Sequence, residues 1–406
     1  MGRKRFKIIY LEITNACNFT CDYCPIDRQT RLKEVMPTDF ACRIMDQIAD
    51  HDLTDTITFH VMGEPYLHKD VAKLVAYAEG RGLHVRLLTN GSLLESKRNR
   101  ALFAAGLTRL EVGFRTPTES AFNMRLRGGS LTLDDYIERT NRLIDDKLET
   151  GAATDVCIKL FIRSHAAALK MADSYEHLTS EEDNKRVARI FQQRALDTAR
   201  RLGLPTQEWE ARPIITRDGE YPIFPGIHLG FSRIQDFWVR EQRGENNGRA
   251  QHKEPVVVPL GGQALDHGVL GQGQASAGGN GRDDAHRYYP ACVGGCSAGF
   301  RDDFGILVSG EVTTCCVDYD GRNVIGDLRK QSLMEVLESA EARRIQRSLA
   351  WFRPPTEFCK ECLGGPTLAT SLIKQVSTAI MDAKDRLRPR VHHRPLLAPQ
   401  RHNDLT

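Results

Sequence analysis

The chain has 406 residues, enough for one large domain with an appendage or for two domains of ordinary size. Its 41% hydrophobic content supports a packed core, and a net charge of +3 is too small to indicate a nucleic-acid partner. No apolar run approaches the roughly 18 residues of a membrane span, so we expect neither a membrane segment nor a signal peptide.

Six β-rich runs alternate with helical stretches over the first half of the chain. We expect strands at residues 6–13, 56–62, 83–89, 107–114, 155–162 and 207–215. Helices are expected between them, and "SEED" at residue 180 is typical of a helix start. Mostly apolar strands that alternate with helices predict a parallel sheet covered by helices, and such sheets bind ligands at the carboxyl ends of their strands.

The second half begins with a change of composition. Residues 241–287, including "GGQALDHGVLGQGQASAGGNGRDD", have no hydrophobic period, so we expect a linker, a disordered loop or a lid. After it, "FGILVSGEVTTCCVDYDGRNVIGDL" predicts a hairpin turning at Ser309-Gly310, and Ser332 with Glu335 predicts a helix start. A last helix is expected at "TSLIKQVSTAIMDAK", before a basic, proline-rich tail.

The chain contains 11 cysteines, and an odd number in clusters favours thiols in a reducing, cytoplasmic compartment over disulfides. Cys17, Cys21 and Cys24 directly follow the first strand, and three thiolates on one loop can converge on one metal centre. A structural zinc site closes with four ligands, whereas a four-iron cluster held by three thiolates keeps one iron open. Cys42 and Cys157 stand alone and are expected in the core.

The spacing C-x3-C-x2-C, with Tyr23 before the last cysteine, resembles the radical S-adenosylmethionine (radical SAM) superfamily. "MGEP" at 62–65 is similar to the family's GGEP segment, and "TNGSLL" at 89–94 is similar to its Thr-Asn-Gly turn. The resemblance implies that Cys17, Cys21 and Cys24 hold a [4Fe-4S] cluster whose open iron binds SAM. It also implies SAM contacts from Gly63, Glu64 and Asn90, with Glu64 accepting from the SAM ammonium.

The fourth strand departs from the family pattern, because "GFRT" puts Gly113 where a serine is usual. The group that holds the SAM carboxylate is therefore open among three arginines. Arg115, Arg125 and Arg127 are the candidates, and we assign Arg127.

The second cysteine group, C-x13-G-x4-C followed by C-x2-C, resembles the SPASM and twitch extensions of radical SAM enzymes. The resemblance implies an auxiliary [4Fe-4S] cluster, and its ligands would be Cys296, Cys315, Cys359 and Cys362. Two separated cysteine pairs would also suit a zinc ribbon. Cys292 and Cys316 are then spare. Each could replace a neighbouring ligand, could donate a hydrogen atom to a substrate radical, or could be an inert buried cysteine.

The predicted fold is α/β, a partial (β/α)6 TIM-like barrel with a C-terminal SPASM/twitch iron–sulfur extension. We expect the radical SAM barrel at residues 1–220, a partly low-complexity insertion at 221–290, the auxiliary-cluster domain at 291–370, and a helix with a basic tail at 371–406. Because the first cysteine is at position 17, we expect no peptide-recognition domain before it.

The resemblance implies a radical SAM oxidoreductase of the dehydrogenase or epimerase type. A 5′-deoxyadenosyl radical would abstract hydrogen from a small polar substrate, such as a sugar, aminocyclitol or nucleoside, in natural-product biosynthesis. Reduced flavodoxin or ferredoxin would supply electrons, and neither nucleic acid nor a membrane is an expected partner. The alternatives are a peptide- or protein-modifying SPASM maturase and a non-catalytic iron–sulfur or zinc protein.

Overall fold

The computed structural model describes residues 5–21, 23–126, 130–162, 180–233, 289–294, 296, 299–365 and 367–387. Its strands form one ten-stranded sheet in the order β10-β9-β8-β1-β2-β3-β4-β5-β7-β6. The strands are β1 (Ile8–Leu11), β2 (Thr56–Thr58), β3 (His84–Thr89), β4 (Arg109–Arg115), β5 (Asp155–Ile162), β6 (Gly219–Phe224), β7 (Ile227–Arg233), β8 (Asp303–Ile306), β9 (Glu311–Thr313) and β10 (Val324–Asp327).

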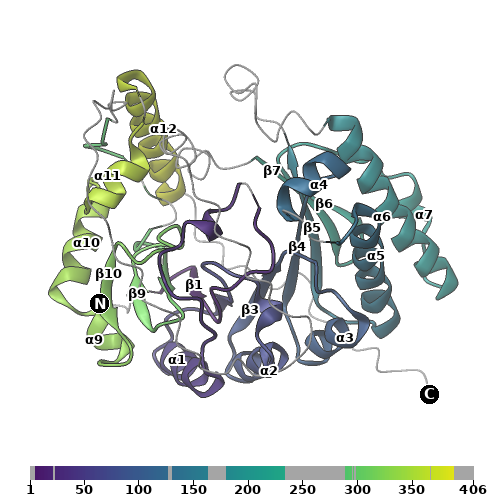
Figure 1. Ribbon diagram of the computed structural model, residues 1–406, viewed down its shortest axis with the longest axis horizontal. Coiled ribbons are helices and arrows are strands. Elements are labelled where there is room, and N and C mark those ends of the chain that lie inside the picture. The colour runs from purple at the N-terminus through teal and green to yellow at the C-terminus, as the bar shows by residue number, and fades with distance from the viewer. Residues whose placement is uncertain are drawn as a thin grey trace.

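The α-helices are α1 (Thr38–Asp50), α2 (Val71–Gly80), α3 (Ser96–Ala104), α4 (Glu119–Leu126), α5 (Leu133–Thr150), α6 (Glu181–Arg201), α7 (Gln207–Glu210), α9 (Leu333–Leu337), α10 (Ala340–Ala350), α11 (Glu357–Leu363) and α12 (Leu368–Leu387). Two 3₁₀ turns, η1 (Pro25–Asp27) and η2 (Pro65–Leu67), follow the first two strands. Figure 1 shows α1, α2 and α3 along the outside of the curved sheet, with α9 to α12 at one end and α4 to α7 at the other.

Six strands, β1, β2, β3, β4, β5 and β7, pair in parallel in that order, so the predicted parallel α/β fold is confirmed. The C-terminal half joins the same sheet, because β8 pairs in parallel with the outer side of β1. The antiparallel strands β9 and β10 continue from β8, with Gly310 at the predicted turn in a positive-φ conformation (+96°). The two halves of the chain therefore share one sheet.

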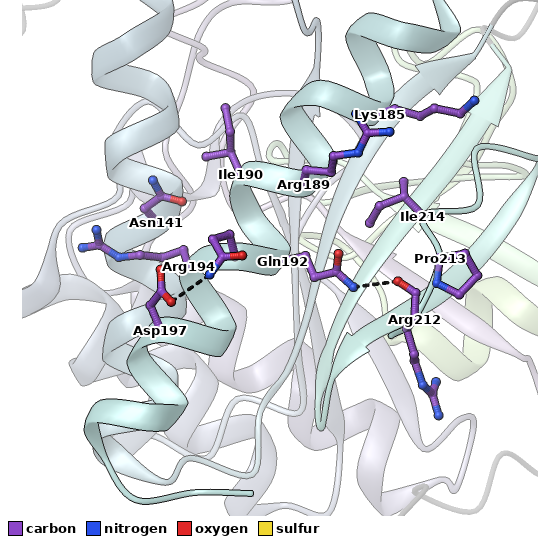
Figure 2. A pocket seen from close by; sticks show the side chains of 11 residues that line it. Asn141, Lys185, Arg189, Ile190, Gln192, Arg194, Asp197, Arg212, Pro213 and Ile214 are labelled. Carbon is purple, nitrogen blue, oxygen red and sulfur yellow. Dashed lines mark hydrogen bonds between the residues drawn. The ribbon is translucent and has the colours of Figure 1, made fainter. Parts of the chain in front are cut away.

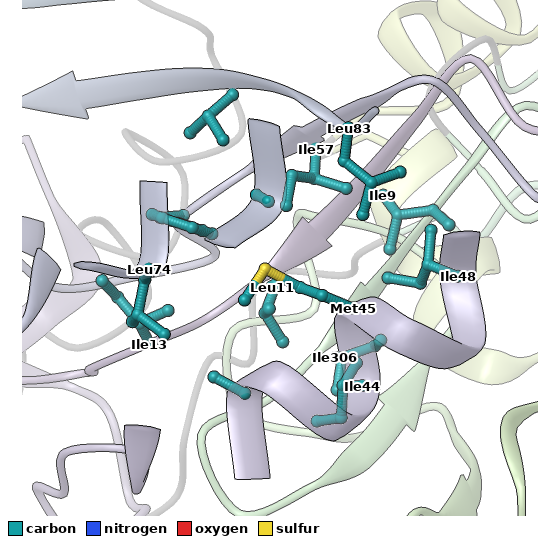
Figure 3. Close-up of a cluster of buried hydrophobic side chains, with 14 of the residues drawn as sticks. Ile9, Leu11, Ile13, Ile44, Met45, Ile48, Ile57, Leu74, Leu83 and Ile306 are labelled. Carbon is teal, nitrogen blue, oxygen red and sulfur yellow. The ribbon is translucent and has the colours of Figure 1, made fainter. Parts of the chain in front are cut away.

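The core lies between the sheet and its outer helices. Ile9 and Leu11 of β1 and Ile306 of β8 are fully buried against Ile44 and Met45 of α1 (Figure 3). Burying each such side chain contributes about 1.5–3 kcal/mol. Because side chains alternate along a strand, the residues between these apolar ones face the opposite, interior side of the sheet.

The predicted strand at residues 207–215 is wrong. Gln207–Glu210 forms the short helix α7, and Ile215 at the end of the segment is exposed. Pro213 has no N–H for a strand ladder, which removes a bond that a central strand needs. The sixth parallel position belongs to Ile227–Arg233, whose Ile227, Leu229 and Phe231 are buried.

Two predicted helix starts are confirmed by complete capping boxes. Ser180 and Asp183 begin α6, and Ser332 and Glu335 begin α9. The segment 241–287 lies outside the described residues, and the domain boundaries remain predictions. Among the helices that the structure describes, none is long and apolar enough to cross a membrane.

Candidate functional site

The first three cysteines lie on the loop that leaves the carboxyl end of β1. Cys21 is buried, with 8% of its surface exposed, and Cys17 and Cys24 are half-buried. Burial raises the pKa of the Cys17 thiol to about 12 and also raises the pKa of Cys24, and the neighbouring sulfurs add to the shift at both. The three thiols are therefore close enough to interact, and a positive centre is needed to make them thiolates.

The chemistry of this donor set fits iron. Three soft sulfur donors on one loop suit an iron–sulfur cluster, and the loop sequence has no fourth cysteine for a closed, all-thiolate zinc site. No three His, Cys, Asp or Glu side chains in the described part of the chain are already drawn together as metal ligands.

Gly63 brings the "MGEP" segment against this loop. Its backbone has φ +84°, and a Cβ at this position would stand 2.3 Å from the Thr14 carbonyl oxygen and 2.9 Å from that of Ala16. The next amide, Glu64 N–H, donates to the Ala16 carbonyl at 2.8 Å. Only glycine permits this approach.

The Glu64 carboxylate makes several hydrogen bonds within the site, and only 1% of the residue is exposed. It accepts hydrogen bonds from Tyr66 N (3.0 Å), Thr89 Oγ1 (2.7 Å) and Asn90 N (2.6 Å). Burial raises its pKa to about 6, against the opposing effect of these three bonds. A carboxylate has about four acceptor positions, so about one is left for an ammonium group.

Asn90 completes the group. Its Nδ2 atom donates to Cys17 Sγ at 3.6 Å and to Asn18 Oδ1 at 2.9 Å. Gly63, Glu64 and Asn90 therefore all lie beside the first cysteine loop, although Gly63 and Glu64 come from the segment after β2 and Asn90 follows β3. Arg127, our candidate for the SAM carboxylate, lies outside the described residues.

Arg125, one of the three arginines considered for the SAM carboxylate, is buried beside Glu64 and Asn90. It is 1% exposed, and its guanidinium donates to the carbonyl oxygens of Phe114 (2.5 Å) and Gly113 (2.9 Å). It also lies over the Phe19 ring at 4.9 Å. Arg125 therefore ties the end of β4 to the cysteine loop, a role that sequence reasoning missed.

Arg115 occupies strained backbone at the end of β4. Its φ is +61°, and the β4–β5 register shifts between Val112 and Arg115, as at a bulge. A non-glycine residue in this region costs about 1–3 kcal/mol. Its guanidinium lies 4.7 Å above the Phe161 ring, whose edge meets the Tyr23 ring of the cysteine loop at 5.2 Å.

Five further polar side chains of the interior face were missed by sequence reasoning. They are Tyr10, His60, Arg86, Glu111 and Lys159. Glu111 accepts from Arg86 at 2.7 Å and pairs with Lys159 at 2.6 Å. Although burial opposes it, Lys159 and Arg86 help to hold the pKa of Glu111 well below its usual range. Burial lowers the pKa of His60 to about 4, so its imidazole is neutral at pH 7.

The second cysteine group gathers around the loop after β9. Cys296 and Cys315 both lie next to Gly299. Cys296 Sγ is so close that a Cβ added to Gly299 would be 2.8 Å from it, and Gly299 forms a β-bridge with Cys315. Cys359 and Cys362 lie on α11, and Asn323 Nδ2 donates to Cys359 Sγ at 3.8 Å. Four thiols here suit a fully cysteine-ligated cluster, but also a zinc site, on donor chemistry alone.

The adjacent cysteines of this loop have different neighbours. Cys315 is buried, and Cys296 is the thiol with the largest electrostatic effect on it. Cys316 is instead hydrogen bonded to the Tyr10 hydroxyl on the interior face. Burial raises the pKa of Cys316 to about 11, so it is a thiol at neutral pH. Cys292 is exposed, with its backbone N–H donating to Gln375 on α12. These contacts support Cys315 as a ligand and Cys316 as a spare thiol.

A buried ion pair connects the two cysteine regions. Glu12 is 0% exposed and accepts from Arg31 Nη1 at 2.6 Å and Arg31 Nη2 at 2.8 Å. It also accepts from Met62 N (3.0 Å) in the "MGEP" segment and from Val308 N (2.9 Å) after β8. Arg31 in turn donates to the Tyr319 carbonyl at 2.7 Å.

A groove of about 960 Å³ lies on the outer helix layer, between α5, α6 and residues 212–214 (Figure 2). Its charged lining includes Lys185, Arg189, Arg194 and Asp197. No residue assigned from the sequence lines it. The residues assigned from the sequence and described by the structure lie at the carboxyl edge of the sheet or near the loop after β9, away from this groove.

We expect Glu64→Gln to weaken SAM binding about tenfold. The lost charge removes a charge-assisted hydrogen bond worth roughly 1.5–3 kcal/mol, and about 1.4 kcal/mol is a factor of ten. The new amide NH2 would also face a protein donor, so the melting temperature should fall. Titration of SAM and thermal unfolding measure the two effects. Glu34→Gln, on an exposed glutamate nearby, is the control, and equal SAM affinity in Glu64→Ala and wild type would remove Glu64 from the site.

For the auxiliary site, we expect Cys359→Ala or Cys362→Ala to lower bound iron from about eight to about four atoms per chain, because two cubane clusters share no ligand. Cys292→Ala should retain all the iron, since this thiol is exposed. Iron analysis after anaerobic reconstitution measures this. Zinc in place of iron in the C-terminal site would contradict the assignment, and iron loss in Cys292→Ala but not Cys296→Ala would shift the ligand set.

Comparison with known proteins gives two family matches. Residues 11–159 match the Radical SAM superfamily, and residues 296–363 match SPASM, an iron-sulfur cluster-binding domain. The first match contains the cysteine loop, the "MGEP" segment and Asn90. The second begins at Cys296 and ends one residue after Cys362.

Individual relatives are more distant. The PqqA peptide cyclase of Bradyrhizobium diazoefficiens is 32% identical over 110 residues, covering 26% of this chain and 28% of its own. The S-adenosyl-L-methionine-dependent 2-deoxy-scyllo-inosamine dehydrogenase of Niallia circulans is 31% identical over 113 residues, covering 27% of this chain and 45% of its own. The chain thus spans less than half the length of these curated relatives. The crystal structure of BtrN in complex with AdoMet and 2-DOIA has 14% identity and a TM-score of 0.44, covering 88% of this chain and 93% of that one.

The two family matches imply the cofactors. A radical SAM domain takes SAM and a [4Fe-4S] cluster, and a SPASM domain takes an auxiliary iron–sulfur cluster.

Proposed function

Because the chain belongs to the radical SAM superfamily and carries a C-terminal SPASM domain, we propose that it abstracts a hydrogen atom from a small polar substrate and thereby oxidises or epimerises it. A sugar, aminocyclitol or nucleoside of natural-product biosynthesis is the substrate class. When bound, the first cluster and SAM supply a 5′-deoxyadenosyl radical. All other steps belong to residues of the chain.

The cofactor-holding residues follow from the site. Cys17, Cys21 and Cys24 hold the first cluster, and Cys296, Cys315, Cys359 and Cys362 hold the auxiliary one. Gly63 and Asn90 shape the SAM site around Glu64, whose remaining acceptor position faces the SAM ammonium. Arg127 holds the SAM carboxylate.

The polar interior face is the observation that carries the choice of substrate. Tyr10, His60, Arg86 and Lys159 come from four different strands or strand ends of one face. Such side chains suit a substrate rich in hydroxyl or charged groups, which a few placed polar groups can orient. Tyr23 connects this face to the cysteine loop through Phe161.

Cys316 is the better of the two candidate hydrogen donors. An epimerisation needs a hydrogen atom delivered to the substrate radical, and a protonated thiol can give one. Cys316 is held as a thiol beside Tyr10 on the interior face, whereas Cys292 is exposed. We therefore assign Cys316 to this role if the reaction inverts a carbon centre.

The alternative is a peptide- or protein-modifying enzyme, and the similarity to a PqqA peptide cyclase favours it. In either case reduced flavodoxin or ferredoxin is the electron donor. None of the 11 cysteines forms a disulfide in the structure, which supports a reducing, cytoplasmic location.

Deuterium transfer tests the substrate class. Candidate sugars, aminocyclitols and nucleosides, each deuterated at its carbon positions, would be incubated anaerobically with the reconstituted protein, SAM and a reductant. Deuterium in 5′-deoxyadenosine from one of these supports a small polar substrate. Deuterium only from a labelled peptide would establish the alternative.

A further inference from the structure

Four cations line the interior face of β3, β4 and β5. They are Arg86, Arg109, Arg115 and Lys159. Arg86, Arg109 and Lys159 share the buried Glu111 carboxylate, at 2.7, 2.8 and 2.6 Å. Glu111 alone cannot neutralise three cations.

Two further carboxylates, Asp155 and Glu220, pair with the same group of cations, so Arg115 is the one of the four without a carboxylate partner among the described residues. Arg109 also pairs with Asp155 (3.2 Å) and Glu220 (2.6 Å). Lys159 reaches Glu220 at 3.8 Å. Among the residues that the structure describes, the only carboxylate paired with Arg86 is Glu111, which it shares with the other two cations. The Arg86 side chain is 37% exposed.

Arg115 contacts none of these carboxylates. Its described polar contact is one hydrogen bond from Nη1 to Ser232 Oγ at 3.2 Å, and the ring of Phe161 supports the guanidinium plane at 4.7 Å. A guanidinium carries five N–H donors, so most of its donors are not used by the part of the chain described. Ser232 and Phe161 fix its direction without neutralising it.

The backbone conformation of Arg115 sets the direction of its side chain. The shift of register before Arg115 and its positive φ turn the residue away from the regular alternation of β4. Bulges of this kind occur beside active sites, where they redirect a side chain. A strained conformation held by its surroundings points to a function at that residue.

The neighbours do not cancel the charge. His60 lies close enough to Arg86, Lys159 and Arg115 for each to lower its pKa, and it is neutral at pH 7. Tyr10 contacts the His60 ring edge-to-face at 5.4 Å and presents a hydroxyl. His60 and Tyr10 are therefore polar and uncharged, and the only acidic group that acts on Tyr10 among the described residues besides Cys316 is Asp303, whose pKa burial raises to about 7.

On the premise of the function proposed above, we propose that the substrate carries an anionic group, a phosphate or a carboxylate, and that Arg115 binds it with support from Arg86 and Lys159. The planar guanidinium fork matches both groups in a bidentate manner. A phosphorylated or carboxylated sugar or nucleoside fits this face. A cationic aminocyclitol without an acidic group does not fit, because the cations would repel its ammonium.

The test is anion binding by the reconstituted, SAM-loaded full chain. Inorganic pyrophosphate represents a phosphate substrate, malonate a dicarboxylate and glucosamine a cationic sugar, each titrated by calorimetry. We expect saturable binding of pyrophosphate or malonate that weakens with salt, and the tighter of the two identifies the group. Arg115→Met should weaken it at least tenfold. Arg115→Lys, which keeps the charge but loses the fork, should give an intermediate value.

Arg189→Met, on an exposed arginine of the outer groove in Figure 2, is the matched control and should change the affinity less than twofold. Affinity lost in Arg189→Met and kept in Arg115→Met would overturn the proposal, as would tighter binding of glucosamine than of either anion. Thermal unfolding checks that the variants fold. SAM cleavage measured on the same samples separates this proposal from the function itself, because cleavage without anion binding refutes the anionic substrate alone.

Discussion

Replacing Cys17, Cys21 and Cys24 together with alanine is expected to abolish SAM cleavage and to lower bound iron from about eight to about four atoms per chain. The reason is that, in the proposed assignment, these three thiols are the protein ligands of the first cluster and none of them binds the second. The remaining iron should belong to the C-terminal domain. Iron analysis and product chromatography after anaerobic reconstitution measure the two quantities.

Cys42→Ala is the matched control, because Cys42 lies in α1 among core residues and is far from both groups in the chain. It should retain iron and activity. Full iron content in the triple variant, or continued formation of 5′-deoxyadenosine, would show that these cysteines are not the ligands.

Arg31→Met is expected to lower the free energy of unfolding by about 3–5 kcal/mol, because it leaves a buried carboxylate without its cation. Glu12 has no exposed surface, and the Arg31 side chain is only 12% exposed. The Met62 and Val308 amides would then be the only donors left of those described for this carboxylate. Denaturant unfolding of the full chain, with the slope of the transition checked for constancy, gives the change.

Lys33→Met is the control on the same loop, where the side chain is exposed, and it should change stability by less than about 0.5 kcal/mol. In the double variant Glu12→Gln with Arg31→Met, the unpaired charge is absent, so part of the stability should return. A loss below about 1 kcal/mol in Arg31→Met would be typical of an exposed ion pair and would contradict a buried connection between the two cysteine regions.

The cysteine loop and its companions were predictable because their chemistry is local. Thiols at short spacing indicate a site for a soft metal. Gly63 and Asn90 belong to short motifs that follow apolar strands. The parallel direction of the strands was also predictable, because strands that alternate with helices form parallel sheets. What the motifs did not reveal is that Glu64 bonds three protein donors, because these come from η2 and β3 and meet it only in the folded chain.

The polar interior face was missed because each strand contributes only one or two polar residues. Within a single apolar strand, such a residue gives no sign that it belongs to a site. Arg86 between Val85 and Leu87, and Lys159 between Ile158 and Leu160, carry the period-two signal of a face turned away from the core. Their meeting at Glu111 depends on strand register, which the sequence does not state. The same period-two pattern marks Ile227–Arg233 as the true sixth strand.

Arg125 illustrates a different limit. A basic residue between polar and apolar neighbours is expected at a surface, yet this guanidinium is buried and bonds backbone carbonyls of β4. Those carbonyls become available only where β4 ends beside the cysteine loop. A burial of this kind is set by tertiary packing and has no signal in local composition.

One measurement bears on the whole assignment, namely SAM turnover by the anaerobically reconstituted wild-type chain with a strong reductant. A radical SAM enzyme should convert SAM to methionine and 5′-deoxyadenosine, with no product in the absence of reductant. A chain that holds both clusters and binds SAM, yet forms no 5′-deoxyadenosine with or without candidate substrates, would contradict the catalytic role and favour a non-catalytic iron–sulfur protein.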